Sequence, residues 1–384
     1  MVVWGNYAAR GQKVKPDFAA RSTACPQGAK RAQVAGVERS LREVLGGRGR
    51  AGYGRTMVLD FDAYVTDARF ERSGAAIFAL GDGTVRFEDG TSIQAHDGAA
   101  LCACDHPSGE GVITGGDDGR LVWSRRGGAE VLAEAKGRWI DVAASSAASG
   151  LIAFASGREA QVRDVKDPAF ANSLAHERAV AALAFDPKGR RIAAATYGGA
   201  ALWYARIAEQ KPQQLKWAGS HIALAFSPDG RFLISAMQEN ELHGWRLADS
   251  TDMRMGGYPS KVKSLAFLDR GRMMATSGSA GAVIWPFGGS NGPMGKQAAE
   301  VGFQEGVLVT RVAAPPGAPR VAAGLDDGRV WTAELTRTGV EFLMAEKGPQ
   351  ITALSVSQDG RRIAWGDEEG GAGVAEIGAE GAGG

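Results

Sequence analysis

Residues 224–245, LAFSPDGRFLISAMQENELHGW, contain two short apolar segments, 224–226 and 232–234, separated by Ser-Pro-Asp-Gly-Arg. Proline presets φ at the second position of a turn and glycine accepts a positive φ later in it, so the two segments are predicted to be antiparallel strands. A third strand ends at Trp245. A three-stranded unit of this size cannot bury its apolar faces alone and needs neighbours.

Copies of this unit supply the neighbours. Residues 183–190 (LAFDPKGR) place their turn glycine 41 positions earlier, and residues 265–272 (LAFLDRGR) place theirs 41 positions later. Looser copies bring the number of units to eight. A period near 40 residues with an aromatic residue at the end of the third strand is typical of a propeller blade. The third strands are predicted to end at Phe87, Trp123, Arg163, Trp203, Trp245, Trp285, Trp331 and Val374.

These features resemble the WD-repeat family of β-propellers over about residues 57–377. The resemblance rests on the LAFSPDG turn, on the Asp-Gly hairpins and on the Trp that closes the third strand. It departs from the family in that no closing Trp is followed by Asp, and the Gly-His pair survives only as Ala95-His96, Ala175-His176 and a shifted Gly219-Ser220-His221. The resemblance implies an all-β fold, an eight-bladed β-propeller of four-stranded antiparallel blades, with seven blades as the alternative.

Composition agrees with this fold. Glycine accounts for 55 of 384 residues, roughly twice ordinary usage, and folds built from strands and turns use glycine at many turns. Three cysteines cannot supply a disulfide framework, and the pair Cys102 and Cys104 is expected to pack between blades. No stretch reaches the roughly 18 to 20 apolar residues that a membrane span requires. We expect a cytoplasmic, monomeric propeller that makes no membrane contact.

Residues 1–56 differ from the rest of the chain. They carry 11 Lys and Arg against 3 acidic residues, a net charge of +8, which leaves −7 for the remainder. A basic segment of low apolar content suggests a solvated, disordered arm, but a start codon assigned too early and a targeting or nucleic-acid-binding arm are alternatives. The propeller is expected at 57–378, followed by a Gly/Ala tail at 379–384.

The last repeat unit lacks an outer strand of its own, because only Gly, Ala and Glu follow Ile377. An unpaired sheet edge invites association with other chains, and propellers avoid it by pairing the first strand with the last blade. Residues 58–63 have apolar side chains at Val58, Leu59 and Phe61. We expect this segment to be the outermost strand of the last blade and to close the ring.

The resemblance also implies a hydrogen-bonded tetrad within the second blade, formed by His96, Thr114, Asp118 and Trp123. A buried polar group needs such partners. The same residue types could form a catalyst, but no second constellation in the chain supports a reaction. The aromatic residues expected to close the other blades and to lie in the core are Phe87, Trp203, Trp245, Trp285 and Trp331.

One rim of the propeller is the expected partner surface. The connections that enter each blade and the hairpins between its second and third strands gather on the same rim, and Trp, Tyr and Arg dominate interface energies. On the opposite rim, residues 286–293 form a longer loop that could be merely mobile or could bind a partner. The candidate rim residues are Arg138, Trp139, Arg178, Tyr197, His221, Glu239, Tyr258 and Lys261.

An enzyme would need convergent acids, bases or ligands. The chain has five His without metal-binding spacing, no phosphate-binding GxxxxGK[ST] loop and no GxSxG elbow. The net acidic propeller would repel phosphates, so nucleic acid is not an expected partner. We expect a non-catalytic scaffold for a protein or peptide partner, without a catalytic residue, metal or cofactor. The alternative is a propeller hydrolase with a metal or carboxylates at its central channel.

Overall fold

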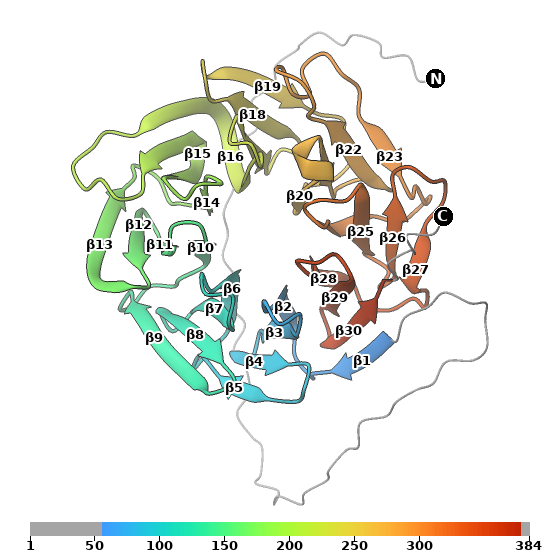
Figure 1. Cartoon of the computed structure of the whole chain (residues 1–384), viewed down its shortest axis with the longest axis horizontal. Coiled ribbons are helices and arrows are strands. Elements are labelled where there is room, and N and C mark those ends of the chain that lie inside the picture. The colour runs from blue at the N-terminus through green and yellow to red at the C-terminus, as the bar shows by residue number, and fades with distance from the viewer. Residues whose placement is uncertain (1–55, 378–384) are drawn as a thin grey trace, which may run out of the picture. The chain divides into compact units, whose positions relative to one another are not determined.

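The computed structural model describes residues 56–377, which form short antiparallel strands and one 3-10 turn, η1 (Asp269–Gly271). The sheets follow one another around a central opening, and each sheet has an edge strand beside it, which is β28 (Ile351–Val356) in the sheet that also contains the N-terminal strand (Figure 1). The second strand from the opening is buried along its whole length in several sheets, as in β3 (Ala76–Leu80), whereas outer strands such as β9 (Gly128–Glu134) are largely exposed. No helix in the described residues is long and apolar enough to cross a membrane.

Six of the sheets have four strands, each hydrogen-bonded to its neighbours in antiparallel register. Chain order and sheet order coincide in the first three, which are β2 (Val65–Phe70), β3, β4 (Thr84–Phe87) and β5 (Ser92–Gln94); β6 (Ala100–Asp105), β7 (Val112–Gly116), β8 (Arg120–Arg125) and β9; and β10 (Val142–Ser146), β11 (Leu151–Ser156), β12 (Glu159–Asp164) and β13 (Asp167–Ala175).

Two further four-stranded sheets come later in the chain, and the last sheet combines strands from both ends of the described chain. Their strands are β20 (Leu265–Leu268), β21 (Met273–Thr276), β22 (Ala282–Pro286) and β23 (Ala299–Val301); β24 (Val309–Ala313), β25 (Arg320–Leu325), β26 (Val330–Glu334) and β27 (Glu341–Met344); and β28 (Ile351–Val356), β29 (Arg362–Asp367), β30 (Gly371–Glu376) and β1 (Thr56–Asp60).

The remaining sheet has six strands and joins two repeat units. It contains β14 (Ala182–Phe185), β15 (Arg191–Tyr204), β16 (Gln213–Phe226), β17 (Phe232–Met237), β18 (Leu242–Arg246) and β19 (Thr251–Met255). β15 and β16 are 14 residues long, and each pairs with one neighbour along its first half and with another along its second half. The described residues therefore form seven sheets, the number of the alternative, and not eight separate ones, because the fourth and fifth repeat units share one sheet.

The N-terminal strand completes the sheet of the C-terminal strands. β1 pairs with β30 in antiparallel register, from Thr56 opposite Ala375 to Asp60 opposite Gly371. The sequence placed this strand at 58–63, which is too far along the chain, because Asp62 adopts a φ of 55° and the chain turns there toward β2. The expected domain boundary at residue 57 also falls inside this strand.

Apolar clusters fill the space between neighbouring sheets, and hydroxyl groups on the innermost strands add hydrogen bonds from sheet to sheet. Thr66 Oγ1 donates to Ala100 O at 3.0 Å, and Thr352 Oγ1 donates to Val65 O at 2.6 Å. The second bond links the sheet of β28 to the sheet of β2. All five aromatic residues expected in the core are buried, with exposed fractions from 0% for Trp331 to 9% for Trp285.

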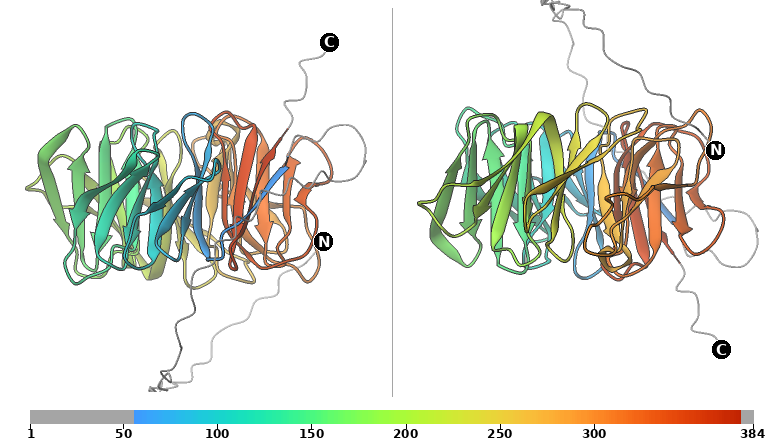
Figure 2. Two further views of the ribbon diagram at one scale, coloured as in Figure 1. Left: turned by 90° about the horizontal axis from the view of Figure 1, so that it is seen from below. Right: turned by 90° about the horizontal axis from the view of Figure 1, so that it is seen from above.

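Because successive strands alternate in direction, the connecting segments lie on two opposite rims (Figure 2). Counted outward from the innermost strand of each repeat unit, with the two halves of β15 and of β16 counted as separate strands, the segments that follow the second and fourth strands lie on one rim, here called the connection rim. The segments that follow the first and third strands, η1 among them, lie on the opposite rim, which faces the viewer in Figure 1. Residues 1–55 and 378–384 lie outside the described part of the chain, and they include the whole expected Gly/Ala tail and all but the last residue of the expected basic arm.

Candidate functional site

The structure brings three of the four expected tetrad residues together. His96 is buried on the segment that enters β6, and its Nδ1 lies 3.0 Å from Asp118 Oδ1 while its Nε2 lies 2.8 Å from Thr114 Oγ1. Burial alone would raise the pKa of Asp118, but hydrogen bonds from the Arg120 N–H and the His96 ring outweigh it and lower that pKa. This network ties the hairpin 117–119 to the segment before β6.

Trp123, the expected fourth member, lies elsewhere. Its Nε1 donates to Glu110 O at 2.8 Å, and its indole stacks on the His106 ring with 3.9 Å between centroids. The Arg125 guanidinium lies 3.9 Å from the indole centroid as well. The tetrad is therefore a triad, because His106 in the β6–β7 turn and Arg125 hold the indole at the opposite rim.

A hydrogen-bonded series of three residues that does include the closing indole occurs in another sheet. Trp285 Nε1 donates to the Tyr258 hydroxyl at 2.6 Å, and this hydroxyl lies 2.7 Å from Thr276 Oγ1. Burial raises the pKa of Tyr258 to about 12. Tyr258 was expected on the partner rim, and this prediction is wrong because its ring fills the space between β19 and β20 and leaves only 8% exposed.

The spacing of residues in the sequence indicates this hydrogen-bonded series. Tyr258 precedes Thr276 by 18 positions and Trp285 by 27. His96 precedes Thr114 by the same 18 positions, and Trp203 Nε1 donates to His176 Nε2, 27 positions earlier, at 3.1 Å. Tyr258 thus occupies the place that histidine has in other units.

His221 was also expected on the rim and is instead fully buried. Its Nδ1 lies 2.7 Å from Ser235 Oγ, and its Nε2 lies 3.1 Å from Trp217 O. Burial is the main reason that the pKa of His221 is lowered. The prediction fails because β16 runs without a break through residues 216–221, so His221 begins the pairing with β17 and does not sit in a loop.

The other candidate rim residues lie on the connection rim. Trp139 is 65% exposed and Tyr197 is 64% exposed, whereas Lys261 is half-buried. Two further aromatic side chains on the same rim were not predicted, Tyr64 at 45% and Phe303 at 63% exposed. They lie in the segments that enter β2 and β24, outside the repeated motif, so only their position before an innermost strand could have indicated them. The remaining candidates, all exposed, are Arg138, Arg178 and Glu239.

Backbone hydrogen bonds hold the Trp139 segment in place. Arg138 N donates to Ala135 O at 3.0 Å, and Ile140 N donates to Gly116 O at 3.0 Å. The Ile140 side chain is fully buried, so Trp139 stands between two fixed residues. An exposed aromatic side chain on a fixed backbone loses little conformational entropy when it binds.

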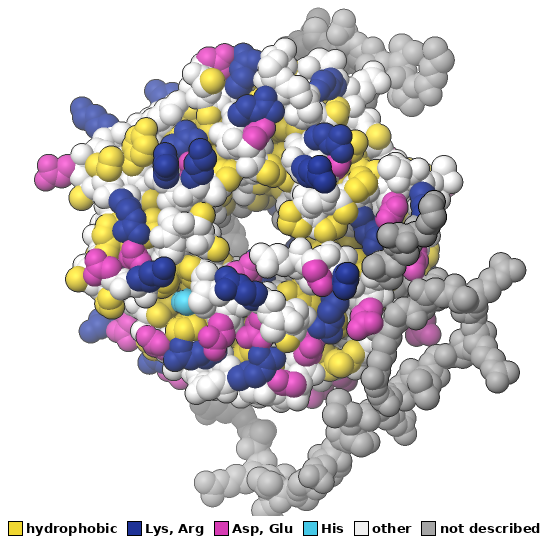
Figure 3. All heavy atoms as spheres, viewed as in Figure 1, with side chains coloured by type: hydrophobic (Ala, Val, Ile, Leu, Met, Phe, Trp, Pro, Cys, Tyr) yellow, Lys and Arg dark blue, Asp and Glu magenta, His cyan; other side chains and the backbone are white. Residues whose placement is uncertain are grey.

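The two rims differ in charge. The segments between strands on the connection rim carry 15 Asp and Glu against 8 Lys and Arg. Those on the opposite rim carry 10 Asp and Glu against 13 Lys and Arg. Figure 3 shows the opposite rim, where Lys and Arg side chains are spread around the central opening. The connection rim is therefore the acidic face of the described residues.

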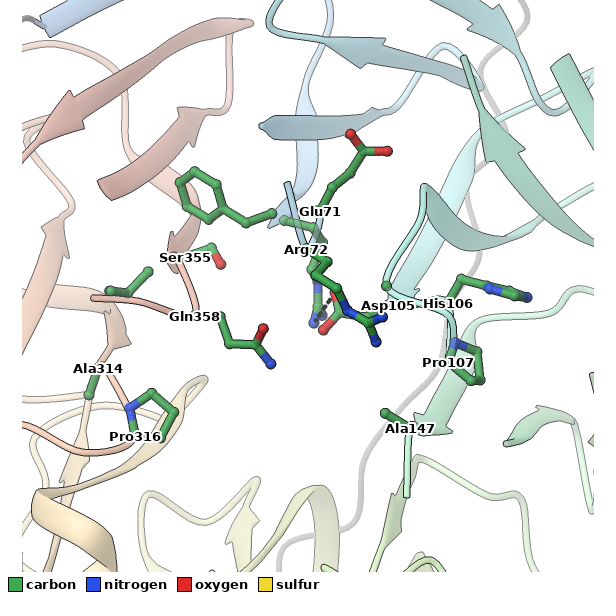
Figure 4. A pocket seen from close by; sticks show the side chains of 14 residues that line it. Glu71, Arg72, Asp105, His106, Pro107, Ala147, Ala314, Pro316, Ser355 and Gln358 are labelled. Carbon is green, nitrogen blue, oxygen red and sulfur yellow. Dashed lines mark ion pairs between the residues drawn. The ribbon is translucent and has the colours of Figure 1, made fainter. Parts of the chain in front are cut away.

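A cavity of about 250 Å³ lies at the mouth of the channel on the opposite rim, where Arg72 and Gln358 come from two turns and Asp105 from the end of β6 (Figure 4). Of its lining residues, Arg69 lies 3.7 Å from Asp105, and Arg69 also pairs with Asp67 at 2.8 Å. Within residues 56–377 no group of three or more His, Cys, Asp or Glu is arranged to hold a metal ion.

Comparison with known proteins agrees with the fold. Residues 88–123, which include the His96 network, match the family model described as WD domain, G-beta repeat. The chain is similar to the crystal structure of the computationally designed Ika8 protein with a TM-score of 0.65 and 18% sequence identity, over 83% of this chain and 98% of that one. No curated protein sequence matches the chain. The structural likeness concerns the fold alone.

Proposed function

Because this chain is a WD-repeat β-propeller, we propose that it is a non-catalytic scaffold whose connection rim binds a protein or peptide partner. The observation that carries the proposal is the gathering of four exposed aromatic side chains on this one rim: Tyr64, Trp139, Tyr197 and Phe303. Such side chains are the usual anchors of protein interfaces. They come from four different segments, so only the folded ring presents them together.

Hydrogen bonds also make the connection rim rigid, which favours its use as a docking surface. Tyr197 pairs with Ser220 across β15 and β16, and the Ser220 N–H donates to both carboxylate oxygens of Glu239 at 3.1 and 3.2 Å. The Trp139 segment is fixed in the same manner by its backbone. A preorganised surface keeps more of its contact energy as affinity. The acidic character of the rim favours a partner segment with net positive charge, and long-range attraction of this kind weakens in salt.

The test compares two triple variants with matched side-chain losses. Trp139→Ala, Arg178→Ala and Tyr197→Ala remove exposed side chains from the connection rim. Tyr204→Ala, Ile207→Ala and Arg361→Ala remove exposed side chains from the opposite rim. Both variants should melt within a few degrees of the parent, since surface substitutions seldom exceed about 0.5 kcal/mol each.

Tagged forms of the parent and both variants are then used to capture partners from a native cell extract, with mass spectrometry as the readout. The connection-rim variant should lose the partners that the parent and the opposite-rim variant both retain. If the opposite-rim variant is the one that loses them, the proposed surface is wrong and the loop at 286–293 lies on the better face.

A further inference from the structure

Three cationic residues lie where two neighbouring sheets begin at the connection rim. Lys261 and Lys263 belong to the segment that leads into β20, and Arg311 is the third residue of β24. β20 and β24 are the first strands of adjacent sheets and therefore line the channel. The three charged residues therefore come from the entry segment of one sheet and the innermost strand of the next.

Hydrogen bonds between the two sheets fix this arrangement. Ser264 Oγ donates to Val312 O at 2.8 Å and accepts from Val312 N at 3.0 Å. Ser264 follows Lys263 and Val312 follows Arg311, so this reciprocal pair holds the two cationic residues next to each other. The Lys263 N–H is held as well, because it donates to Ser277 Oγ at 3.0 Å.

The Lys263 side chain is influenced electrostatically by the other two. Burial is the largest cause that lowers the pKa of Lys263, and the positive charges of Arg311 and Lys261 lower it further. The pKa of Arg311 is lowered by burial too. Like charges this close are unfavourable unless an anion lies between them.

Few anionic groups oppose these charges. Within residues 56–377, no carboxylate lies within ion-pair distance of Lys261, Lys263 or Arg311, and the Arg311 side chain makes its one hydrogen bond to Thr310 O at 3.1 Å. The acidic groups that act electrostatically on Arg311 are Tyr64 and Asp67, and Asp67 is itself paired with Arg69 at 2.8 Å. Glu368 faces Lys263, but its Oε1 accepts a hydrogen bond from Gln350 N at 3.4 Å.

We propose that Lys261, Lys263 and Arg311 form a binding site for a phosphate monoester group at the connection rim. The three cations together with the carboxylate of Glu368 have a net charge of about +2. A phosphate monoester carries about −1.5 to −2 at neutral pH and therefore matches this charge. The Arg311 guanidinium can hold two phosphate oxygens at once, and the two lysines add point charges around them. A carboxylate ligand would leave part of this charge unmatched. The site does not depend on the proposed docking function.

The phosphate group can belong to a small molecule or to a phosphorylated partner, and the test distinguishes the two. Isothermal titration calorimetry at constant ionic strength is performed on the full chain with inorganic phosphate, with a phosphoserine peptide and with the same peptide unphosphorylated. Lys263→Gln and Arg311→Gln remove one charge each. Lys347→Gln is the matched control, because Lys347 is an exposed lysine on the same rim that faces Asp327 at 3.7 Å.

The parent and Lys347→Gln should bind phosphate within twofold of each other, and Lys263→Gln should bind roughly tenfold more weakly, the effect of one charge-assisted hydrogen bond. Arg311→Gln should lose phosphate binding. Arg311→Lys keeps the positive charge but not the bidentate geometry of the guanidinium, so it should recover part of the binding. Such a recovery shows that the loss in Arg311→Gln is not caused by misfolding. A phosphopeptide that binds more tightly than inorganic phosphate places the group on a partner, whereas equal affinities indicate a free ligand. Absence of binding to either phosphorylated probe, or equal loss in Lys263→Gln and Lys347→Gln, overturns the proposal.

Discussion

The indole N–H of Trp285 and the hydroxyl of Tyr258 are joined by a 2.6 Å hydrogen bond in the buried space between β19 and β22. Thr276 Oγ1, 2.7 Å from the same hydroxyl, continues the chain into β21. The bond ties the segment that enters a sheet to the third strand of that sheet. In the sheet of β14 and β15 the same tie is made by His176 and Trp203.

Tyr258→Phe should destabilise the protein although it keeps the ring. The indole N–H of Trp285 loses its acceptor, and a buried donor left without a partner costs about 1 to 3 kcal/mol. Urea unfolding followed by circular dichroism measures the loss. Tyr258→His should recover part of it, because histidine occupies this place in other units. Tyr197→Phe, an exposed control on the same rim, should unfold like the parent, and a similar loss in this control would contradict the argument.

Trp331→Phe should cost less than Trp285→Phe. Both indoles are buried, but Trp331 Nε1 has no hydrogen-bond partner within the described residues, whereas Trp285 Nε1 donates to Tyr258. The two substitutions remove the same volume, so the difference reports the hydrogen bond, about 1 to 2 kcal/mol. Unfolding free energies of both variants give this difference directly. Equal costs would mean that packing alone decides the stability at both sites.

The repeated pattern predicted most of the fold because it is dictated by local chemistry. The Pro-Asp-Gly turn at 228–230 and the closing Trp245 recur at a fixed distance, so the strands and their antiparallel order follow from turn geometry and burial. The shared sheet of the fourth and fifth units could not be predicted in this way. It depends on whether residues 216–221 leave the sheet as a loop or continue the strand, and both conformations suit the same side chains.

The site residues were harder to predict, because exposure depends on neighbouring sheets. Trp139 and Tyr197 are exposed as expected, and Tyr258 and His221 are buried although they come from comparable segments. A tyrosine before an innermost strand can point to solvent or replace a buried histidine. The spacing of 18 residues to Thr276 and 27 to Trp285 separates these cases, but the family pattern places histidine and not tyrosine at this position.

Removal of the first described strand should have a larger effect than removal of the chain before it. A protein that starts at Thr56 keeps every described strand and should melt like the full chain. A protein that starts at Tyr64 lacks β1 and exposes the edge of β30, which should lead to oligomers or aggregates. Size-exclusion chromatography with light scattering distinguishes them. Identical elution of the two truncated proteins would show that β1 is not needed on that edge.

Stability should fall in mild acid because of His243. Its ring is fully buried and stacks on Trp217 with 3.9 Å between centroids, and neither ring nitrogen has a hydrogen-bond partner within residues 56–377. Burial lowers the pKa of His243 to about 4, while Asp252, 3.9 Å from Nε2, acts against this shift and the charges of His221 and Arg254 add to it.

The sign follows from proton binding. Between the unfolded pKa of about 6.5 and the folded pKa of about 4, the unfolded chain binds the proton and the folded chain does not. The contribution of His243 to the free energy of unfolding is therefore fully present above pH 6.5. This contribution is lost as the pH falls toward 4, and the loss amounts to at most about 3 kcal/mol. His243→Phe keeps a flat ring against Trp217 and sacrifices no hydrogen bond, so its unfolding free energy should fall less between pH 7 and pH 4.5. Parallel pH profiles for the parent and His243→Phe would assign the acid sensitivity to other groups.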